Sequence, residues 1–285
     1  MNTEASPSAS KTRAFLQMPL TRLIVGFLLV FIAVAIVQTV IVALPVSRVW
    51  SSILLVGFTV PVAYGAYYVL VHFIERRQMT ELSASGAVRE TAQGIGIGAV
   101  LLGAIMLILT LTGAYKSAGA NSFSVLLRPF LLAVSSAVFE EILFRGVLFR
   151  IIERSLGSWL ALAISAAIFG GLHLLNQNAT LIGAVAIIVT AGITLGGAFM
   201  LTRRLWLPMG IHFAWNFALS GVFGSVVSGN LAAQGLLRSS LTGPDWLTGG
   251  TFGVEASIVT VIIGAAVGIF FLWRATKKGN ILRRQ

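Results

Sequence analysis

Long apolar runs follow one another along this sequence, and only short polar segments separate them. A helix needs about 20 mostly apolar residues to cross the roughly 30 Å of hydrocarbon in a bilayer. Eight runs approach that length: Leu23–Leu44, Ser52–Ile74, Ala92–Ala114, Val125–Phe149, Trp159–Leu175, Leu181–Leu201, Trp206–Val227 and Glu255–Trp273. The sequence therefore predicts an all-α, polytopic membrane protein with about eight transmembrane helices.

Composition excludes the soluble classes of protein. Of the 285 residues, 57% are hydrophobic and only 10% are charged. Soluble domains have about a quarter of their residues charged. A surface this poor in charge cannot be solvated by water, which excludes a soluble enzyme, a disordered protein and a free nucleic-acid binder. The sequence contains no cysteine, so disulfides, thiolate metal sites and cysteine nucleophiles are excluded as well.

Lys and Arg are distributed unequally between the two sides of the predicted bundle. One side receives fifteen of the twenty: Lys11, Arg13, Arg22, Arg76, Arg77, Arg89, Arg150, Arg154, Arg203, Arg204, Arg274, Lys277, Lys278, Arg283 and Arg284. The other side receives Arg48, Lys116, Arg128 and Arg238. Cytoplasmic loops are the ones enriched in Lys and Arg, so both termini are predicted to face the cytoplasm. The basic face is expected to attract anionic lipid rather than nucleic acid.

The order of runs and loops predicts five regions. They are a cytoplasmic tail (1–22), three transmembrane helices (23–124), a catalytic core of four transmembrane helices (125–227), an extracytoplasmic Gly- and Ser-rich loop (228–254), and a last transmembrane helix with a basic cytoplasmic tail (255–285). We expect a multi-pass protein of a plasma membrane, in a bacterium.

Two adjacent glutamates and an arginine lie within the fourth apolar run. Glu140, Glu141 and Arg145 occur in the sequence AVSSAVFEEILFRGVLF. An ionisable side chain at the centre of a membrane helix costs on the order of 2.5–3.5 kcal/mol on insertion scales. Glu141 and Arg145 are four residues apart, so they share a helix face and can pair. Glu140 is rotated by about 100° and is free to point elsewhere. The set predicts either a polar clasp between helices or a functional site.

Two of the three histidines also lie in apolar runs. His173 ends the segment AAIFGGLH, and His212 lies in LPMGIHFAWN with Asn216 one turn later. His72 stands beside charged residues at the end of the second run, and we expect it to be solvated at the membrane interface. A single buried histidine is usually a satisfied core residue. Two of them, together with the Glu-Glu-Arg set and the asparagine, predict one shared site.

A shared site places a condition on the helices. At about 1.5 Å per residue, His212 lies about six residues, and His173 about fourteen, from the cytoplasmic ends of their runs. The two side chains can meet only if helices are tilted or broken, or if the helix boundaries are shifted by a turn. The Gly170-Gly171 pair and Pro208 are the expected positions of such breaks.

These residue types can activate water. A glutamate can act as the general base, imidazoles can position the water, and an asparagine amide can donate to an oxyanion. Glu140, His173 and His212 could equally form a His₂-carboxylate set that binds a divalent metal such as zinc. Both alternatives end in a water attacking a carbonyl. The sequence contains neither HExxH nor GxSxG, the usual signatures of zinc proteases and of many serine hydrolases.

Three motifs in this order resemble those of the CPBP intramembrane protease family. That family includes type II CAAX prenyl proteases and bacteriocin-processing or immunity proteins. The motifs are EExxxR at Glu140–Arg145, FxxxH at Phe169–His173 and HxxxN at His212–Asn216, within about Val125–Val227.

The resemblance implies an endopeptidase that cleaves a membrane-associated protein or peptide inside the fourth to seventh predicted helices. The first glutamate would activate water together with the histidine of FxxxH, and the HxxxN pair would bind the oxyanion. The second glutamate and the arginine would orient the site, and the phenylalanine would pack. Family members are described as metalloproteases, so the choice between metal and metal-free chemistry stays open. A peptide precursor, a bacteriocin leader or a membrane anchor is the expected substrate.

Two other functions are compatible with the same residues. A peptide-binding or bacteriocin-immunity protein would bind a membrane peptide without cleaving it. A proton-coupled transporter would use Glu140 and the histidines as a proton relay.

Overall fold

The computed structural model describes residues 17–230 and 234–284, and it is 75% helical. The predicted tail 1–22, including Lys11 and Arg13, therefore lies largely outside the described residues. The α-helices are α2 (Pro19–Ala43), α3 (Arg48–Val69), α4 (Ala87–Leu111), α5 (Leu127–Glu141), α6 (Arg150–Leu156), α7 (Ser158–Leu172), α8 (Leu181–Ile187), α9 (Ile193–Thr202), α10 (Trp206–Phe217), α11 (Asp245–Thr248) and α12 (Ile258–Lys277).

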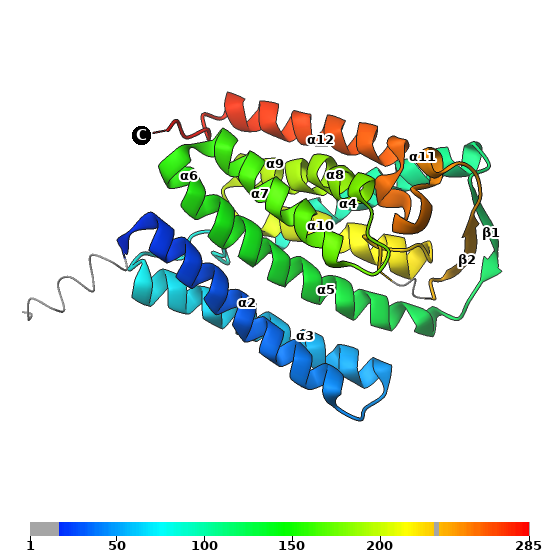
Figure 1. Ribbon diagram of the computed structural model, residues 1–285, viewed down its shortest axis with the longest axis horizontal. Coiled ribbons are helices and arrows are strands. Elements are labelled where there is room, and N and C mark those ends of the chain that lie inside the picture. Colours follow the sequence, from blue (N-terminus) through cyan, green and yellow to red (C-terminus); the bar gives the residue numbers. More distant parts are fainter. Residues whose placement is uncertain (1–16, 231–233, 285) are drawn as a thin grey trace, which may run out of the picture.

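Shorter segments connect or extend these helices. Four are π-helical: η1 (Leu70–Ile74), η3 (Ile142–Phe149), η5 (Ile188–Gly192) and η6 (Ala218–Val222). Four are 3₁₀ turns: η2 (Phe123–Leu126), η4 (His173–Leu175), η7 (Gly250–Phe252) and η8 (Val254–Ala256). The longer helices run roughly alongside one another in one bundle (Figure 1).

Within the described residues, six helical segments are long and apolar enough to cross a membrane. They are Pro19–Ala43, Arg48–Ile74, Ala87–Leu111, Ser158–Leu175, Leu181–Thr202 and Ile258–Lys277, and they overlap six of the eight predicted runs. The other two runs are also helical, but α5–η3–α6 carries several charged residues and α10–η6 is short. The chain is a multi-pass membrane protein, and the full count of eight spans stays a prediction.

A small sheet corrects the all-α prediction. Strands β1 (Tyr115–Ala120) and β2 (Leu237–Leu241) pair antiparallel, with Tyr115 opposite Leu241. Part of the segment predicted as a loop (228–254) therefore pairs with residues that follow α4. The strands are short and far apart in sequence, so no local pattern revealed them.

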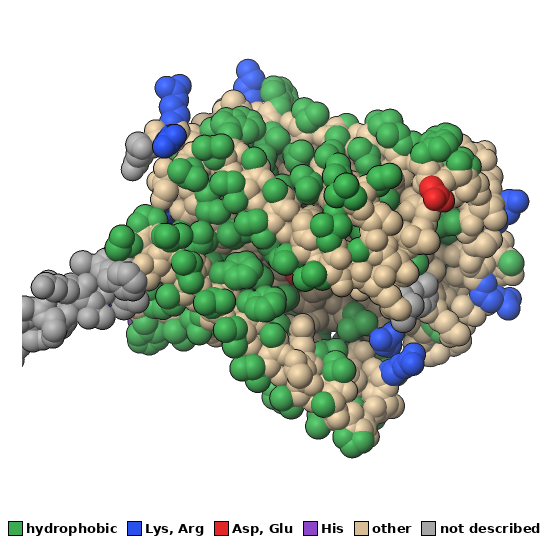
Figure 2. Space-filling view, in the orientation of Figure 1, with side chains coloured by type: hydrophobic (Ala, Val, Ile, Leu, Met, Phe, Trp, Pro, Cys, Tyr) green, Lys and Arg blue, Asp and Glu red, His purple; other side chains and the backbone are tan. Residues whose placement is uncertain are grey.

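The outer surface of the bundle is apolar. Hydrophobic side chains cover much of the face seen in Figure 2. Leu28, Phe31, Trp159 and Ile182 are each more than 40% exposed. Large apolar side chains exposed along whole helices are expected where lipid is the solvent.

The two ends of the bundle differ in structure. The described chain begins and ends at the same end, left in Figure 1, which we call the termini end. There Gln17 donates to the carbonyl of Ile74 at 2.6 Å, and Ser158 N donates to the carbonyl of Leu282 at 3.0 Å. The opposite end carries β1, β2 and α11, and we call it the sheet end.

Buried ion pairs close the termini end. Glu75 accepts from Arg77 at 2.7 Å and from Arg150 at 2.9 Å, and Glu81 pairs with Arg77 at 3.0 Å. Burial would raise the pKa of Glu75, but Arg150 and Arg77 outweigh it and hold that pKa below its usual range. These pairs tie the segment after α3 to α6.

Glycines let α10 approach α4 closely. A Cβ on Gly94 would stand 2.4 Å from the carbonyl oxygen of Leu207, and one on Gly210 would stand 2.4 Å from that of Thr91. Small residues allow backbones to touch in this way in membrane helices. The contact fixes how deeply α10 sits in the bundle, and α10 carries His212 and Asn216.

Candidate functional site

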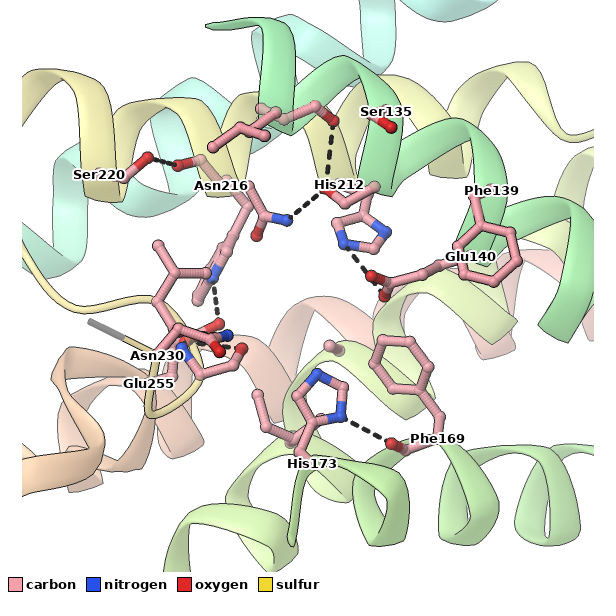
Figure 3. Close-up of a pocket in the computed structure, with 18 of the residues that line it drawn as sticks. Ser135, Phe139, Glu140, Phe169, His173, His212, Asn216, Ser220, Asn230 and Glu255 are labelled. Carbon is pink, nitrogen blue, oxygen red and sulfur yellow. Dashed lines mark hydrogen bonds and ion pairs between the residues drawn. The ribbon is translucent and has the colours of Figure 1, made fainter. Parts of the chain in front are cut away.

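A cavity of about 810 Å³ lies inside the bundle. Its lining comes mainly from α5, α7, α10 and the π-helical turn η5, with contributions from α2 and from the segment that precedes α12. Figure 3 shows Glu140, His173, His212 and Asn216 around this space. The EExxxR, FxxxH and HxxxN motifs thus converge on one cavity, as the sequence predicts for a shared site.

The six predicted site residues divide into two groups. Glu140, His173, His212 and Asn216 line the cavity. Glu141 and Arg145 do not line it; they are 0% and 1% exposed and lie behind the lining. The first group can contact a substrate, whereas the second acts on it only through other side chains.

Glu141 connects the two groups. Its Oε1 accepts from Arg145 Nη1 at 2.8 Å and lies 2.9 Å from His212 Nδ1. Because the carboxylate accepts, His212 Nδ1 carries the proton and its Nε2 is turned toward the cavity. Arg145 is held further by the Ala191 carbonyl at 3.2 Å and by the ring of Phe169, 4.8 Å away. The predicted pair four residues apart on one helix face is confirmed.

Glu140 occupies a different environment from its neighbour. Its side chain is 25% exposed, and its Oε2 lies 3.7 Å from His212 Nε2. Glu140 points into the cavity (Figure 3), whereas Glu141 is 0% exposed and does not line it. The expectation that Glu140 is free to face elsewhere is therefore confirmed, and its carboxylate is open to water and substrate.

His173 is oriented by its own helix. It follows the last residue of α7, and its Nδ1 lies 2.7 Å from the Phe169 carbonyl oxygen. A carbonyl can only accept, so Nδ1 donates and Nε2 remains for the cavity. The Phe169 ring packs 4.9 Å from the His173 ring and 6.3 Å from the His212 ring. Phe169 is thus a packing residue between the two histidines.

Asn216 presents its amide one turn after His212. Its Nδ2 donates to Ser136 Oγ at 3.1 Å, and its backbone carbonyl oxygen accepts from the Ser220 hydroxyl at 2.8 Å. An amide nitrogen has two hydrogens, so one donor is left after the bond to Ser136. The third histidine, His72, is exposed and stacks on Tyr68 at 5.2 Å, which agrees with its predicted interfacial position.

The helices meet at the site without the expected breaks. Helix α7 continues through Gly170 and Gly171, and Pro208 lies in the first turn of α10, where a proline is tolerated. Gly170 instead lets α7 pack closely on Ala184 and Ile188. Irregular geometry is found in the π-helical segments η3, η5 and η6 that flank the site, and such bulges often occur at functional sites.

Glu255 is a cavity residue that sequence reasoning missed. It is 2% exposed and accepts from Trp215 Nε1 at 2.9 Å and from the Ser228 hydroxyl at 3.0 Å. Burial raises the pKa of Glu255, although these hydrogen bonds and the nearby His173 act against the shift. It is the first residue of the predicted run Glu255–Trp273, where a charged side chain is not unusual, and the fold of the returning loop buries it.

The donor set of the cavity lacks the convergence of a metal site. Among the residues that the structure describes, no three His, Asp or Glu side chains converge as metal ligands would. The closest His–carboxylate approach from the proposed zinc set, Glu140 Oε2 to His212 Nε2, is 3.7 Å. Zinc binds nitrogen and oxygen ligands at about 2.0–2.2 Å, so two ligands of one tetrahedral ion lie about 3.4 Å apart. The Glu140–His212 pair is near that spacing, but no third ligand among the described residues converges with it. Without a third converging ligand, the described side chains do not form a metal centre.

One comparison with known proteins gave a match. Residues 122–218 match the model of a family described as "Type II CAAX prenyl endopeptidase Rce1-like". The matched segment contains the EExxxR, FxxxH and HxxxN motifs. No significant match was found among curated proteins or among solved structures.

Proposed function

We propose that the chain, whose residues 122–218 match the Rce1-like family model, is a CPBP-family intramembrane endopeptidase that hydrolyses a membrane-associated protein or peptide with an activated water. One observation carries the proposal: a partly exposed Glu140 carboxylate shares a cavity with two histidines whose Nδ1 atoms are already engaged. We place the protein in a bacterial plasma membrane, in keeping with its short loops and basic tail.

In the proposed reaction, Glu140 accepts a proton from a water in the cavity while His173 Nε2 holds that water. The resulting hydroxide attacks the carbonyl carbon of the scissile peptide bond. Glu140 then passes its proton to the leaving nitrogen, which departs as an amine while the new carboxyl group stays on the other fragment. A base that becomes the acid in the second half of a reaction is common in hydrolases.

The negative charge on the attacked oxygen needs donors in a low-dielectric cavity. Asn216 Nδ2 supplies one, and His212 supplies a second from Nε2 when its ring is protonated. Glu141, which accepts from His212 Nδ1, holds that ring in place and balances its charge. Arg145 in turn fixes Glu141. Glu141 and Arg145 are thus positioning residues rather than catalytic ones.

Turnover of a fluorogenic membrane peptide library by the purified protein in lipid vesicles tests the proposal. Glu140→Gln should lower turnover by about 10²–10⁴-fold, the usual contribution of a general base. Glu90→Gln is the matched control, because Glu90 pairs with Arg204 outside the cavity. His173→Gln should also be inactive, and His72→Gln is its matched control.

The alternatives give different results in the same vesicles. A peptide-binding or immunity protein would bind the library without cleaving it and would keep its biological effect in Glu140→Ala. A proton-coupled transporter would show pH-driven flux. Turnover should persist after exhaustive chelation, because the side chains do not converge on a metal; loss that zinc restores would contradict the metal-free route.

A further inference from the structure

The cavity is confined to the half of the bundle near the sheet end. In α5 its lining begins at Arg128, the second residue of the helix, and η3 contributes only Phe144 and Leu143. Gln177 and Asn230, in loops at the sheet end, also line it. No lining residue of the described chain comes from the termini end of the bundle.

At the termini end, buried side chains separate the cavity from the surface. Between the cavity and the termini end lie fully buried side chains such as Phe149, Phe199 and Tyr67, each at most 1% exposed. Behind them stand the pairs of Glu75 with Arg77 and Arg150. Opening this end would separate buried ion pairs, which costs several kcal/mol.

The side of the cavity toward α2 is open to lipid. Phe31 and Val42 of α2 line the cavity and are 43% and 70% exposed, so this wall of the cavity is not sealed by neighbouring helices. Figure 2 shows the molecule hollowed on this face. An apolar segment lying in the bilayer can therefore reach the cavity sideways, while a polar segment reaches it from the sheet end.

Basic residues mark the two ends differently. The termini end carries Arg22, Arg76, Arg77, Arg89, Arg150, Arg154, Arg203, Arg204, Arg274, Lys277, Lys278, Arg283 and Arg284. The sheet end carries Arg48, Lys116, Arg128 and Arg238. By the positive-inside rule, the closed termini end faces the cytoplasm, and the end with the cavity faces away from it.

We propose that the cavity opens to the extracytoplasmic side of the membrane and its adjoining leaflet. Resting on the proposed protease function, the substrate class is then a peptide or protein segment that is anchored in the outer leaflet or displayed at that face. A lipid-modified chain terminus on the cytoplasmic side does not reach this cavity. The access side itself does not depend on catalysis.

The absence of cysteine makes thiol labelling a direct test. Three single-cysteine variants of the full chain are treated in bacterial spheroplasts with a membrane-impermeant maleimide. Ala118→Cys is exposed on β1, Ser85→Cys is exposed at the termini end, and Leu132→Cys lies on the cavity wall. We expect Ala118→Cys and Leu132→Cys to be labelled in intact spheroplasts and Ser85→Cys only after lysis.

Two results would overturn the proposal. One is labelling of Ser85→Cys but not Ala118→Cys in intact spheroplasts, which would invert the topology. The other is labelling of Ala118→Cys together with a Leu132→Cys that reacts only after lysis, which would place the entrance at the other end. Repeating the experiment with Glu140→Gln separates the two claims: unchanged labelling is expected there, whether or not the wild-type protein cleaves peptides.

Discussion

The buried carboxylates at the termini end of the bundle and those at the cavity differ in how fully they are paired with cations. At the termini end, Glu75 forms ion pairs with both Arg77 and Arg150, so its negative charge is balanced by close cations. At the cavity, Oε1 of Glu141 accepts hydrogen bonds from both Arg145 and His212, whereas its Oε2 has no hydrogen-bond partner among the described residues. Glu140 Oε2 lies 3.7 Å from the Nε2 atom of the His212 imidazole.

This difference separates stability from chemistry. Balanced, buried ion pairs hold a structure in one arrangement, but they leave nothing for a ligand to bind. A carboxylate with an open face, beside imidazoles with unused nitrogens, can take up water and substrate. We therefore expect variants at the termini end to change folding, and variants at the cavity to change turnover.

The largest effect on stability is expected from Arg150→Met. It removes a buried cation and leaves the Glu75 carboxylate short of a partner, so the free energy of unfolding should fall by about 3–5 kcal/mol. Equilibrium unfolding in mixed detergent measures it. Arg89→Met, at an exposed position on α4, is the matched control and should change it by less than about 1 kcal/mol. Equal stability of the two variants would contradict the assignment of stability to this end.

A smaller effect is expected where α4 touches α10. Gly94→Ala places a methyl group against the Leu207 carbonyl and should cost about 1–3 kcal/mol of unfolding free energy. It should also lower turnover, because α10 carries His212. Gly96→Ala meets nothing within 4 Å and should be neutral or slightly stabilising. If both variants behave alike, close packing does not set the position of α10.

The next effect concerns turnover rather than folding. Glu141→Gln keeps the shape of the side chain but weakens its hold on His212, so kcat should fall by about 10–100-fold with little change in KM, as for other supporting residues. Steady-state kinetics across a pH series is the measurement. A loss as large as that of Glu140→Gln would mean that Glu141 takes part directly.

The smallest effect is on acid sensitivity. A carboxyl whose pKa is lowered on folding stabilises the protein above its usual pKa, and this contribution is lost as the pH falls through the lower folded value. Glu75→Gln should therefore lose less stability than the wild type between neutral and acid pH. Thermal unfolding over that range tests it, and parallel curves would show that Glu75 contributes nothing.

Local spacing predicted much of the site. The four-residue separation of Glu141 and Arg145, and the rotation of Glu140 away from them, follow from helix geometry alone. The convergence of His173 and His212 was inferred from their improbable place in apolar runs. The breaks expected at Gly170-Gly171 and Pro208 are not found, because the packing of α7 and α10 depends on contacts between helices that no single segment reveals.

Glu255 and the sheet show the limits of local reasoning more sharply. Burial of Glu255 depends on Ser228 and Trp215, which are 27 and 40 residues away in sequence. The pairing of β1 with β2 likewise joins segments from different parts of the chain. Such features arise from the three-dimensional path of the loop, and neither hydropathy nor spacing carries that information.

The π-helical segment Ile142–Phe149 connects the cavity to the termini end along one continuous helix. A π-helical turn holds about one residue more than an α-helical turn, which corresponds to about 100° of rotation. The segment therefore sets the angle about the helix axis between the Glu140 side chain, before it, and the Arg150 side chain, after it. Deletion of one residue from this segment would leave the side chains of Glu140 and Arg150 chemically intact. Glu140 could then not face the cavity while Arg150 faces Glu75. In this helix, chain length between functional groups is as strictly constrained as their identity.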